Sequence, residues 1–182
     1  MVVVENQTNI KLTFEKPQIN TNREEEKKKE LKIISDLLTG ICEESINNKD
    51  INSKIIKSFS SKKIPSISIY NFLDRLVKYS RIQNSTLMLI LIYIDRLCDI
   101  NYVNLTFYNI HKLILASMIV AIKFNEDNYL SNEYYAKIGG VSKNEINNLE
   151  YEFLCLIQFN LFVDDDIFIK YSNFVNNIKS DD

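Results

Sequence analysis

His111 is the single histidine of the 182-residue chain, so any Ser–His or Cys–His chemistry would depend on it. A nucleophile of either kind needs a base within hydrogen-bond reach, and that base must itself be oriented by a third group. His111 stands beside Lys112, near the start of a predicted helix. We therefore expect this histidine to have a packing or helix-surface role rather than a catalytic one.

The cysteines, Cys42, Cys98 and Cys155, are odd in number, far apart and without a C-x-x-C spacing. A zinc site or a disulfide framework would need closely spaced ligands or an even set of partners. Neither is predicted, and this cysteine usage is typical of a reducing compartment. We expect three thiols near helix cores.

Two other clusters could hold a metal ion or a phosphate group. Asp164 to Asp166 offer three carboxylates, but adjacent residues at a helix start point in different directions, so an N-terminal helix cap is the better interpretation. Gly139 and Gly140 lack the further glycines and the preceding strand of a phosphate loop. The sequence therefore predicts no enzyme, no bound metal and no small-molecule cofactor.

The composition predicts one all-α domain. Hydrophobic residues make up 46% of the chain, with three Gly and two Pro, which disfavours a turn-rich β architecture. A net charge of −2 gives no basic field for nucleic acid or anionic lipid. The longest apolar runs are far shorter than the ~20 residues that a membrane span needs. With no secretory segment at the N-terminus, we expect an intracellular protein, in the cytoplasm, the nucleus or both, without nucleic-acid or membrane partners.

Hydrophobic periodicity divides the chain into four parts. Residues 1–22 show no sustained period and are expected to form a loose tail. Residues 23–58 are predicted to hold an N-terminal helix and a linker, and residues 164–182 a C-terminal helix and tail. Between them, residues 59–163 carry five predicted helices.

The third of these five helices positions the rest of the domain. It is predicted to run from Thr106 to Phe124, and its central part has Ser117 as its polar break. Because a helix that is apolar all round must be surrounded by other elements, we place it at the domain centre. Ser142 and Glu145 are predicted to form a capping box at the start of the fifth helix.

Segments of these helices resemble the cyclin box. They read Tyr-Ile-Asp-Arg at 93–96, Ala-Ile-Lys-Phe at 121–124, Glu-Ile-Asn-Asn-Leu-Glu at 145–150 and Phe-Asn-Leu at 159–161. Others are similar to the P-type cyclins of fungi and protists and the U-type cyclins of plants. These are Phe59, Pro-Ser-Ile-Ser-Ile at 65–69, Leu-Val-Lys-Tyr-Ser at 76–80 and Tyr-Ala-Lys-Ile-Gly-Gly-Val at 135–141.

The resemblance implies a five-helix box and a partner, the catalytic subunit of a cyclin-dependent kinase, which the chain would bind and activate. In cyclins, a Lys at the end of the third helix and a Glu on the fifth hold the regulatory helix of the kinase. Those roles fall on Lys123 and Glu150. The apolar positions that match the family's interface are Val120, Phe124, Tyr151, Leu154, Phe159 and Leu161.

Two other residues receive structural roles from the resemblance. Asp95 matches an internal salt-bridge acid of cyclins. Cell-cycle cyclins carry an arginine in an M-R-A-I-L segment where this chain has residues 65–69, and Arg75 is interpreted as supplying the lost charge. A cyclin-fold scaffold or adaptor that activates no kinase is the alternative function that the sequence leaves open.

Overall fold

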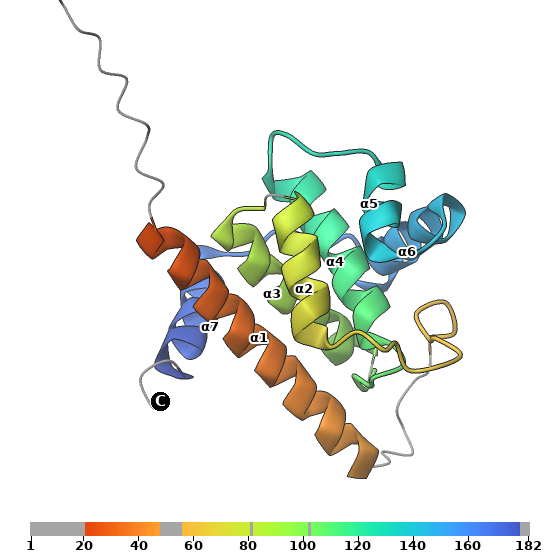
Figure 1. Cartoon of the computed structure of the whole chain (residues 1–182), viewed down its shortest axis with the longest axis horizontal. Helices are drawn as coiled ribbons and strands as arrows, with labels where there is room; N and C mark the ends of the chain where they lie inside the picture. Colours follow the sequence, from red (N-terminus) through yellow and green to blue (C-terminus); the bar gives the residue numbers. More distant parts are fainter. Residues whose placement is uncertain (1–20, 48–55, 81, 102, 179–182) are drawn as a thin grey trace, which may run out of the picture.

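The computed structural model describes residues 21–47, 56–80, 82–101 and 103–178 (Figure 1). Within these ranges the chain forms helices and no strand, which confirms the expected all-α class. The helices are α1 (Thr21–Asn47), α2 (Ile69–Ser80), α3 (Asn84–Asn101), α4 (Ile110–Asn125), α5 (Asn132–Gly139), α6 (Lys143–Leu156) and α7 (Asp165–Ile178). The expected loose tail falls mostly outside the described ranges, although Thr21 already belongs to α1.

Helix α4 lies at the centre of the domain, as its sequence predicts. Every side chain from Ile110 to Ile122 is buried apart from that of Lys112. The helix packs against α2, α3 and α6, and in Figure 1 these surround it. Its central polar residue is satisfied, because the Ser117 hydroxyl donates to the Ile90 carbonyl over 2.9 Å. Together with α5, which packs against α2 and α6, these helices are the five that the sequence predicts.

Short polar residues begin several of these helices and glycine ends one. The side-chain oxygens of Ser68, Ser131 and Ser142 each accept from a backbone N–H three residues further on. Gly140 ends α5 with a φ of 72°, the left-handed conformation in which glycine has no Cβ penalty. The predicted capping box is half formed: Ser142 caps α6, whereas the Glu145 carboxylate pairs with Lys112.

The start of α4 differs from the prediction. Residues from Thr106 form a turn, and the α-helix begins at Ile110. The Asn109 side chain explains the delay, because its Oδ1 accepts from the Thr106 N–H over 2.8 Å and its Nδ2 donates to the Asn104 carbonyl over 2.9 Å. Such local bonds offer the backbone an alternative to the helix.

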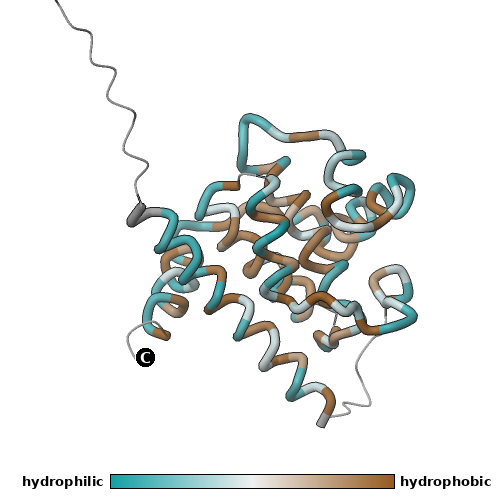
Figure 2. Tube along the Cα trace, in the orientation of Figure 1, coloured by the Kyte–Doolittle hydropathy of each residue, from teal (hydrophilic) through white to brown (hydrophobic). Residues whose placement is uncertain are grey.

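Helices α1 and α7 flank this five-helix unit. The buried residues of α1, from Leu31 to Cys42, recur on one stripe that packs against α2, α3 and α7. Figure 2 shows the brown, hydrophobic parts of the trace gathered where α2, α3 and α4 meet. In the described part of the chain, every helix is too short or too polar to span a membrane.

Candidate partner-binding surface

Lys123 and Glu150 form an ion pair between the last turn of α4 and the middle of α6. The Lys123 Nζ lies 2.6 Å from Oε1 and 2.8 Å from Oε2 of Glu150, so the ammonium bridges both carboxylate oxygens. The two side chains are 31% and 15% exposed. The pair is therefore partly shielded from solvent and still accessible to a partner.

Asn132, the first residue of α5, holds the same carboxylate from a third helix. Its Nδ2 lies 2.6 Å from Oε2 of Glu150 and 2.8 Å from Oδ1 of Asn147. Glu150 thus accepts from α4 and α5 at once, which fixes its orientation before any partner arrives. Sequence reasoning missed Asn132, because a lone polar residue at a helix start carries no periodic signal.

Exposed apolar side chains lie on the same two helices and on the turn that ends α6. Phe124, Tyr151 and Phe159 are 52%, 68% and 60% exposed, which is unusual for such large groups. Leu154 and Leu161 are half-buried. We call this region the Lys123–Glu150 surface, and it consists of Lys123, Phe124, Glu150, Tyr151, Leu154, Phe159 and Leu161.

One predicted member of this surface lies elsewhere. Val120 is 3% exposed and belongs to the hydrophobic core, so its side chain supports the surface from beneath. Val120 was expected at the surface through the family resemblance. Three exposed apolar residues near the same helices were missed, namely Tyr129, Leu130 and Phe162.

The turn that ends α6 places Phe159 on the surface. Gln158 and Phe159 have φ angles of 55° and 54°, the left-handed region that residues other than glycine rarely adopt. The Gln158 N–H donates to the Cys155 carbonyl and the Phe159 N–H to the Leu154 carbonyl, over 3.0 and 2.8 Å. This pair of bonds is the Schellman motif, here built without glycine.

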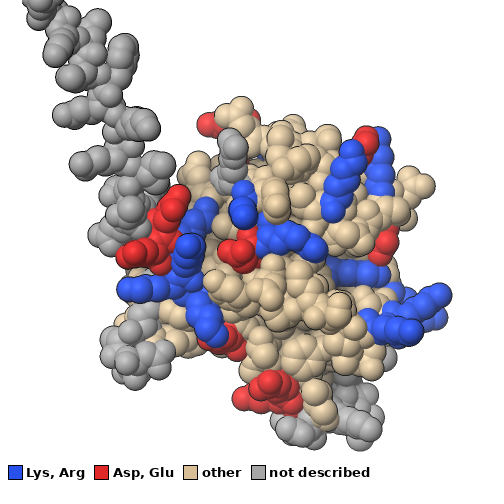
Figure 3. Space-filling model, in the orientation of Figure 1, with Lys and Arg blue, Asp and Glu red and all other residues tan. Residues whose placement is uncertain are grey.

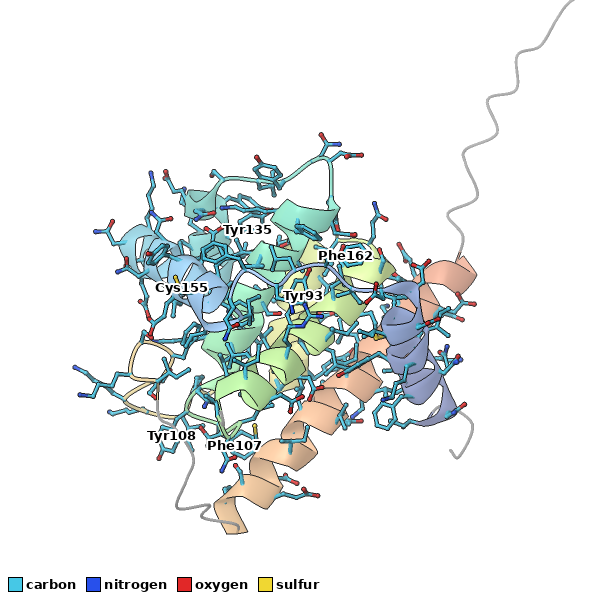
Figure 4. All side chains as sticks on the ribbon, turned by 180° about the vertical axis from the view of Figure 1, so that it is seen from behind. Tyr93, Phe107, Tyr108, Tyr135, Cys155 and Phe162 are labelled. Carbon is cyan, nitrogen blue, oxygen red and sulfur yellow. The ribbon has the colours of Figure 1, made fainter. Side chains whose placement is uncertain are left out.

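Helix α3 then holds the segment that follows. The Tyr93 hydroxyl donates to the Leu161 carbonyl over 2.7 Å, and the Arg96 guanidinium donates to the carbonyls of Asn160 and Phe162. Burial raises the pKa of Tyr93 to about 12, so its hydroxyl stays a donor. Figure 4 shows the segment between α6 and α7 crossing α3, with Tyr93 and Phe162 labelled there. The segment from Phe159 to Leu161 is therefore held at its start by the turn after α6 and at its end by α3.

The Cyclin family model matches residues 7–161, most of the chain. The chain belongs to the cyclin family. It is 32% identical over 145 residues to Cyclin-U4-1 of Arabidopsis thaliana, covering 78% of this chain and 72% of the relative. It is 36% identical over 125 residues to Cyclin-P3-1 of Oryza sativa subsp. japonica, covering 69% of this chain and 52% of the relative.

A fungal relative is the PHO85 cyclin-like protein psl1 of Schizosaccharomyces pombe. Our chain is 39% identical to psl1 over 107 residues, which cover 58% of our chain and 44% of psl1. The predicted likeness to P-type and U-type cyclins is confirmed. The chain spans about half the length of the first relatives it matches.

Asp95 of this cyclin has a different partner from the one expected. It is exposed, and it accepts a hydrogen bond from the Tyr171 hydroxyl of α7. Burial, followed by this bond, raises the pKa of Tyr171. No ion pair reaches Asp95 from the residues that the structure describes, and its bond to Tyr171 ties α3 to α7. The internal salt bridge stays a prediction.

Arg75 lies on α2 with its guanidinium carbon 5.2 Å from the centre of the Phe72 ring. The side chain is half-buried, and its Nε is buried without a hydrogen-bond partner among the described residues. That Arg75 supplies the charge of the missing arginine stays a prediction.

The remaining chemistry-bearing side chains are dispersed. His111 is buried, and its Nε2 lies 2.9 Å from the Ile67 carbonyl. Burial raises the pKa of the Cys42 and Cys98 thiols to about 12. Cys155 is exposed on α6, contrary to the expectation that all three cysteines lie near helix cores. Within the described ranges, no three His, Cys, Asp or Glu side chains are grouped as metal ligands.

Proposed function

We propose that this cyclin is a regulatory subunit that binds and activates a cyclin-dependent protein kinase through the Lys123–Glu150 surface. The chemistry of phosphoryl transfer would belong to the kinase, and the cyclin would work inside the cell. One observation carries the proposal: a bidentate Lys–Glu pair, 2.6 and 2.8 Å long, sits among exposed aromatic residues in a member of the cyclin family.

The arrangement fits the anatomy of a protein interface. Binding energy concentrates in aromatic and charged residues near the centre of a patch, where surrounding contacts exclude water. Here the apolar area comes from Phe124, Tyr151 and Phe159, and the ion pair supplies directional polar contacts that would orient the partner. The N-terminal end of a partner helix would offer unpaired N–H groups to Glu150, and carbonyls near that end would accept from Lys123.

The relatives suggest which kinase to test first. The fission-yeast relative psl1 is named as a PHO85 cyclin-like protein. A kinase of the PHO85 kind is therefore the first candidate partner, and mass spectrometry of proteins that co-purify with the tagged chain identifies the partner without that assumption.

The double variant Lys123→Ala with Glu150→Ala tests the surface. Removing charge-assisted bonds at an interface centre commonly costs about 2–5 kcal/mol, or roughly 30- to 4,000-fold in affinity. We expect co-purification of the kinase to be lost while the circular-dichroism melt stays nearly unchanged. Peptide phosphorylation by the kinase, measured with and without the cyclin, tests activation separately.

Lys112→Ala with Glu145→Ala is the matched control. This second Lys–Glu pair also joins α4 to α6, over 2.9 Å, but it lies at the N-terminal ends of both helices. The control should bind the kinase as the unmodified chain does. Unaltered kinase binding by the Lys123 and Glu150 variant would show that the kinase does not bind at the Lys123–Glu150 surface. Binding without a rise in phosphorylation would favour the scaffold alternative.

A further inference from the structure

A cavity of about 310 Å³ opens between α2, α4, the α5–α6 turn and the segment that precedes α2. Its lining includes Ser61, Phe72, Arg75, His111, Lys112 and Glu145. None of these residues belongs to the Lys123–Glu150 surface. The volume is at the lower end of the range for small-ligand sites, and it exceeds what one water or one free ion fills.

Two buried polar atoms of its lining residues have no hydrogen-bond partner in the described part of the chain. His111 is 7% exposed, and because its Nε2 lies 2.9 Å from the Ile67 carbonyl, that nitrogen must carry the proton and donate. Its Nδ1 is then an acceptor to which no described residue donates. The Arg75 Nε is a buried donor that likewise has no acceptor among the described residues. Buried polar groups without partners are rare, and each points to a missing hydrogen-bonding group.

The charges around the cavity favour an anion. Arg75 and Lys112 are cations, and the one acidic side chain of the lining, Glu145, is paired with Lys112 over 2.9 Å. Lys62 and Lys63 follow Ser61 directly and are exposed. Figure 3 shows basic side chains gathered over this part of the molecule. The positive charge of Arg75 therefore has no acidic counterpart in the lining, and Lys62 and Lys63 add positive charge at the edge of the cavity.

We propose that this cavity binds an oxyanion, a carboxylate or phosphate group, carried by an acidic peptide of a partner protein. The Arg75 Nε would donate to one oxygen of the group. His111 would take up a proton at Nδ1 and donate to a second oxygen, while its Nε2 keeps its bond to Ile67. The exposed Lys62 and Lys63 would meet a neighbouring acidic residue of the same peptide.

Protonation of His111 reports on this event. In the free chain, burial and then the nearby Arg75 charge lower the pKa of His111, although the bond to Ile67 opposes them. The other charged groups of the cavity, Lys112 and Glu145, are paired with each other. A bound oxyanion adds a negative charge next to the imidazole, so it must raise the histidine's pKa.

The imidazole NMR signals give an unambiguous reading, because the chain has one histidine. The probe is a capped tetrapeptide of alanine, phosphoserine, glutamate and alanine. Its neutral counterpart carries serine and glutamine, and inorganic phosphate is the third arm. We expect the acidic peptide to shift the imidazole signals saturably and to raise the pKa of His111, and the neutral peptide to do neither.

Each other outcome overturns the proposal. An unshifted imidazole would mean that water alone satisfies the two atoms, and equal shifts from both peptides would exclude an oxyanion. Inorganic phosphate that binds as tightly as the acidic peptide would exclude a peptide ligand. These arms use the unmodified chain, so they stand even where a variant fails to fold.

Arg75→Gln locates the site. It should weaken binding of the acidic peptide by about tenfold or more, since it removes the charged donor. The control is Lys78→Gln, which removes a charge from the same helix at an exposed position that lines a different cavity. Equal binding by Arg75→Gln and Lys78→Gln would place the peptide elsewhere.

Discussion

The amide nitrogen of Asn132 lies 2.6 Å from Oε2 of Glu150, the carboxylate that Lys123 also binds. Three helices, α4, α5 and α6, therefore meet at one acidic side chain. A carboxylate held by two donors has lost most of its rotamer freedom before binding, so less entropy remains to be lost when a partner arrives. Asn132 is a positioning residue for the proposed kinase interface.

Asn132→Ala should therefore weaken kinase binding without touching the kinase itself. The variant frees the Glu150 carboxylate on one side and leaves its bond to Lys123 in place. We expect an affinity loss of about tenfold, since one hydrogen bond to a charged group contributes about 1.5–3 kcal/mol. Titration calorimetry or biolayer interferometry with the purified kinase measures it.

Asn144→Ala is the control for that experiment. Asn144 is an exposed residue of α6, the helix that carries Glu150, and the variant should bind the kinase normally. Equal affinities for the Asn132 and Asn144 variants would mean that the bond to Glu150 plays no part in presenting the carboxylate.

Gln158→Gly should stabilise the protein. Gln158 occupies the left-handed position after α6 with a φ of 55°, which costs a residue with a Cβ about 1–2 kcal/mol. Glycine removes that cost but gains freedom in the unfolded chain, worth about 0.4–1 kcal/mol. The expected net rise in the free energy of unfolding is about 0.5–1 kcal/mol, which urea denaturation resolves.

The matched variant is Gln83→Gly. Gln83 is also exposed, but it is not among the described residues with positive φ, and its N–H donates to Glu126 over 2.9 Å. Glycine should destabilise the chain there. A loss of stability in both variants would show that the turn at Gln158 carries no strain.

Much of this fold could be predicted from the sequence because local chemistry and burial agree. Ser142 begins α6 through its side-chain cap, Gly140 ends α5 in the left-handed conformation, and the apolar centre of α4 is buried on all sides. The prediction failed at Thr106, where the Asn109 side chain bonds to the backbone and delays the helix. Helix caps and hydrophobic stripes can be predicted from residues close in the sequence. Whether a side chain bonds to the backbone in place of the helix depends on its conformation, which the sequence does not show.

The site was less accessible to sequence reasoning. Lys123 and Glu150 are 27 residues apart and came together through the family resemblance, not through any local signal. Val120 came from the same resemblance, and its burial at 3% exposure depends on packing between helices that no local signal shows. Asn132 and Arg96 act through bonds to distant backbone or carboxylate atoms, and no spacing rule reveals such bonds.

Stability should fall as the pH drops below about 6.5, because His111 is buried in its neutral form. Burial lowers the pKa of His111 in the folded chain, so the unfolded chain binds the proton more readily. The stabilising contribution is complete above the unfolded pKa of about 6.5, and it is lost progressively as the pH falls toward the lower folded value. Urea denaturation at about pH 7.5 and about pH 5.5 measures the change.

His111→Gln separates this histidine from the carboxylates that also titrate in acid. The variant keeps a side-chain N–H for the Ile67 carbonyl and cannot be protonated in this range. Its stability should change less between the two pH values than that of the unmodified chain. Buffers without phosphate or carboxylate are required, since either anion is a proposed ligand of the same cavity. Identical pH profiles for the two proteins would contradict the assignment.

Cys155 should be the one cysteine that a bulky maleimide labels in the folded chain. Burial raises the pKa of Cys42 and Cys98 to about 12, so almost none of either thiol is present as the reactive thiolate. Cys155 is exposed on α6, where Figure 4 labels it, and it lies one helical turn after Tyr151 of the Lys123–Glu150 surface. Intact-mass spectrometry should find one label per chain, and none on Cys155→Ser.

The same label tests which side of α6 meets the kinase. Cys155 and Tyr151 are neighbours one turn apart, so a bulky adduct on the thiol should obstruct a partner that covers Tyr151. We expect the label to weaken kinase binding by about tenfold or more, since the adduct would keep the Tyr151 side chain from packing against the kinase. Cys155→Ser treated with the same reagent should bind normally. Labelled chains that bind the kinase as tightly as unlabelled ones would place the interface away from Tyr151.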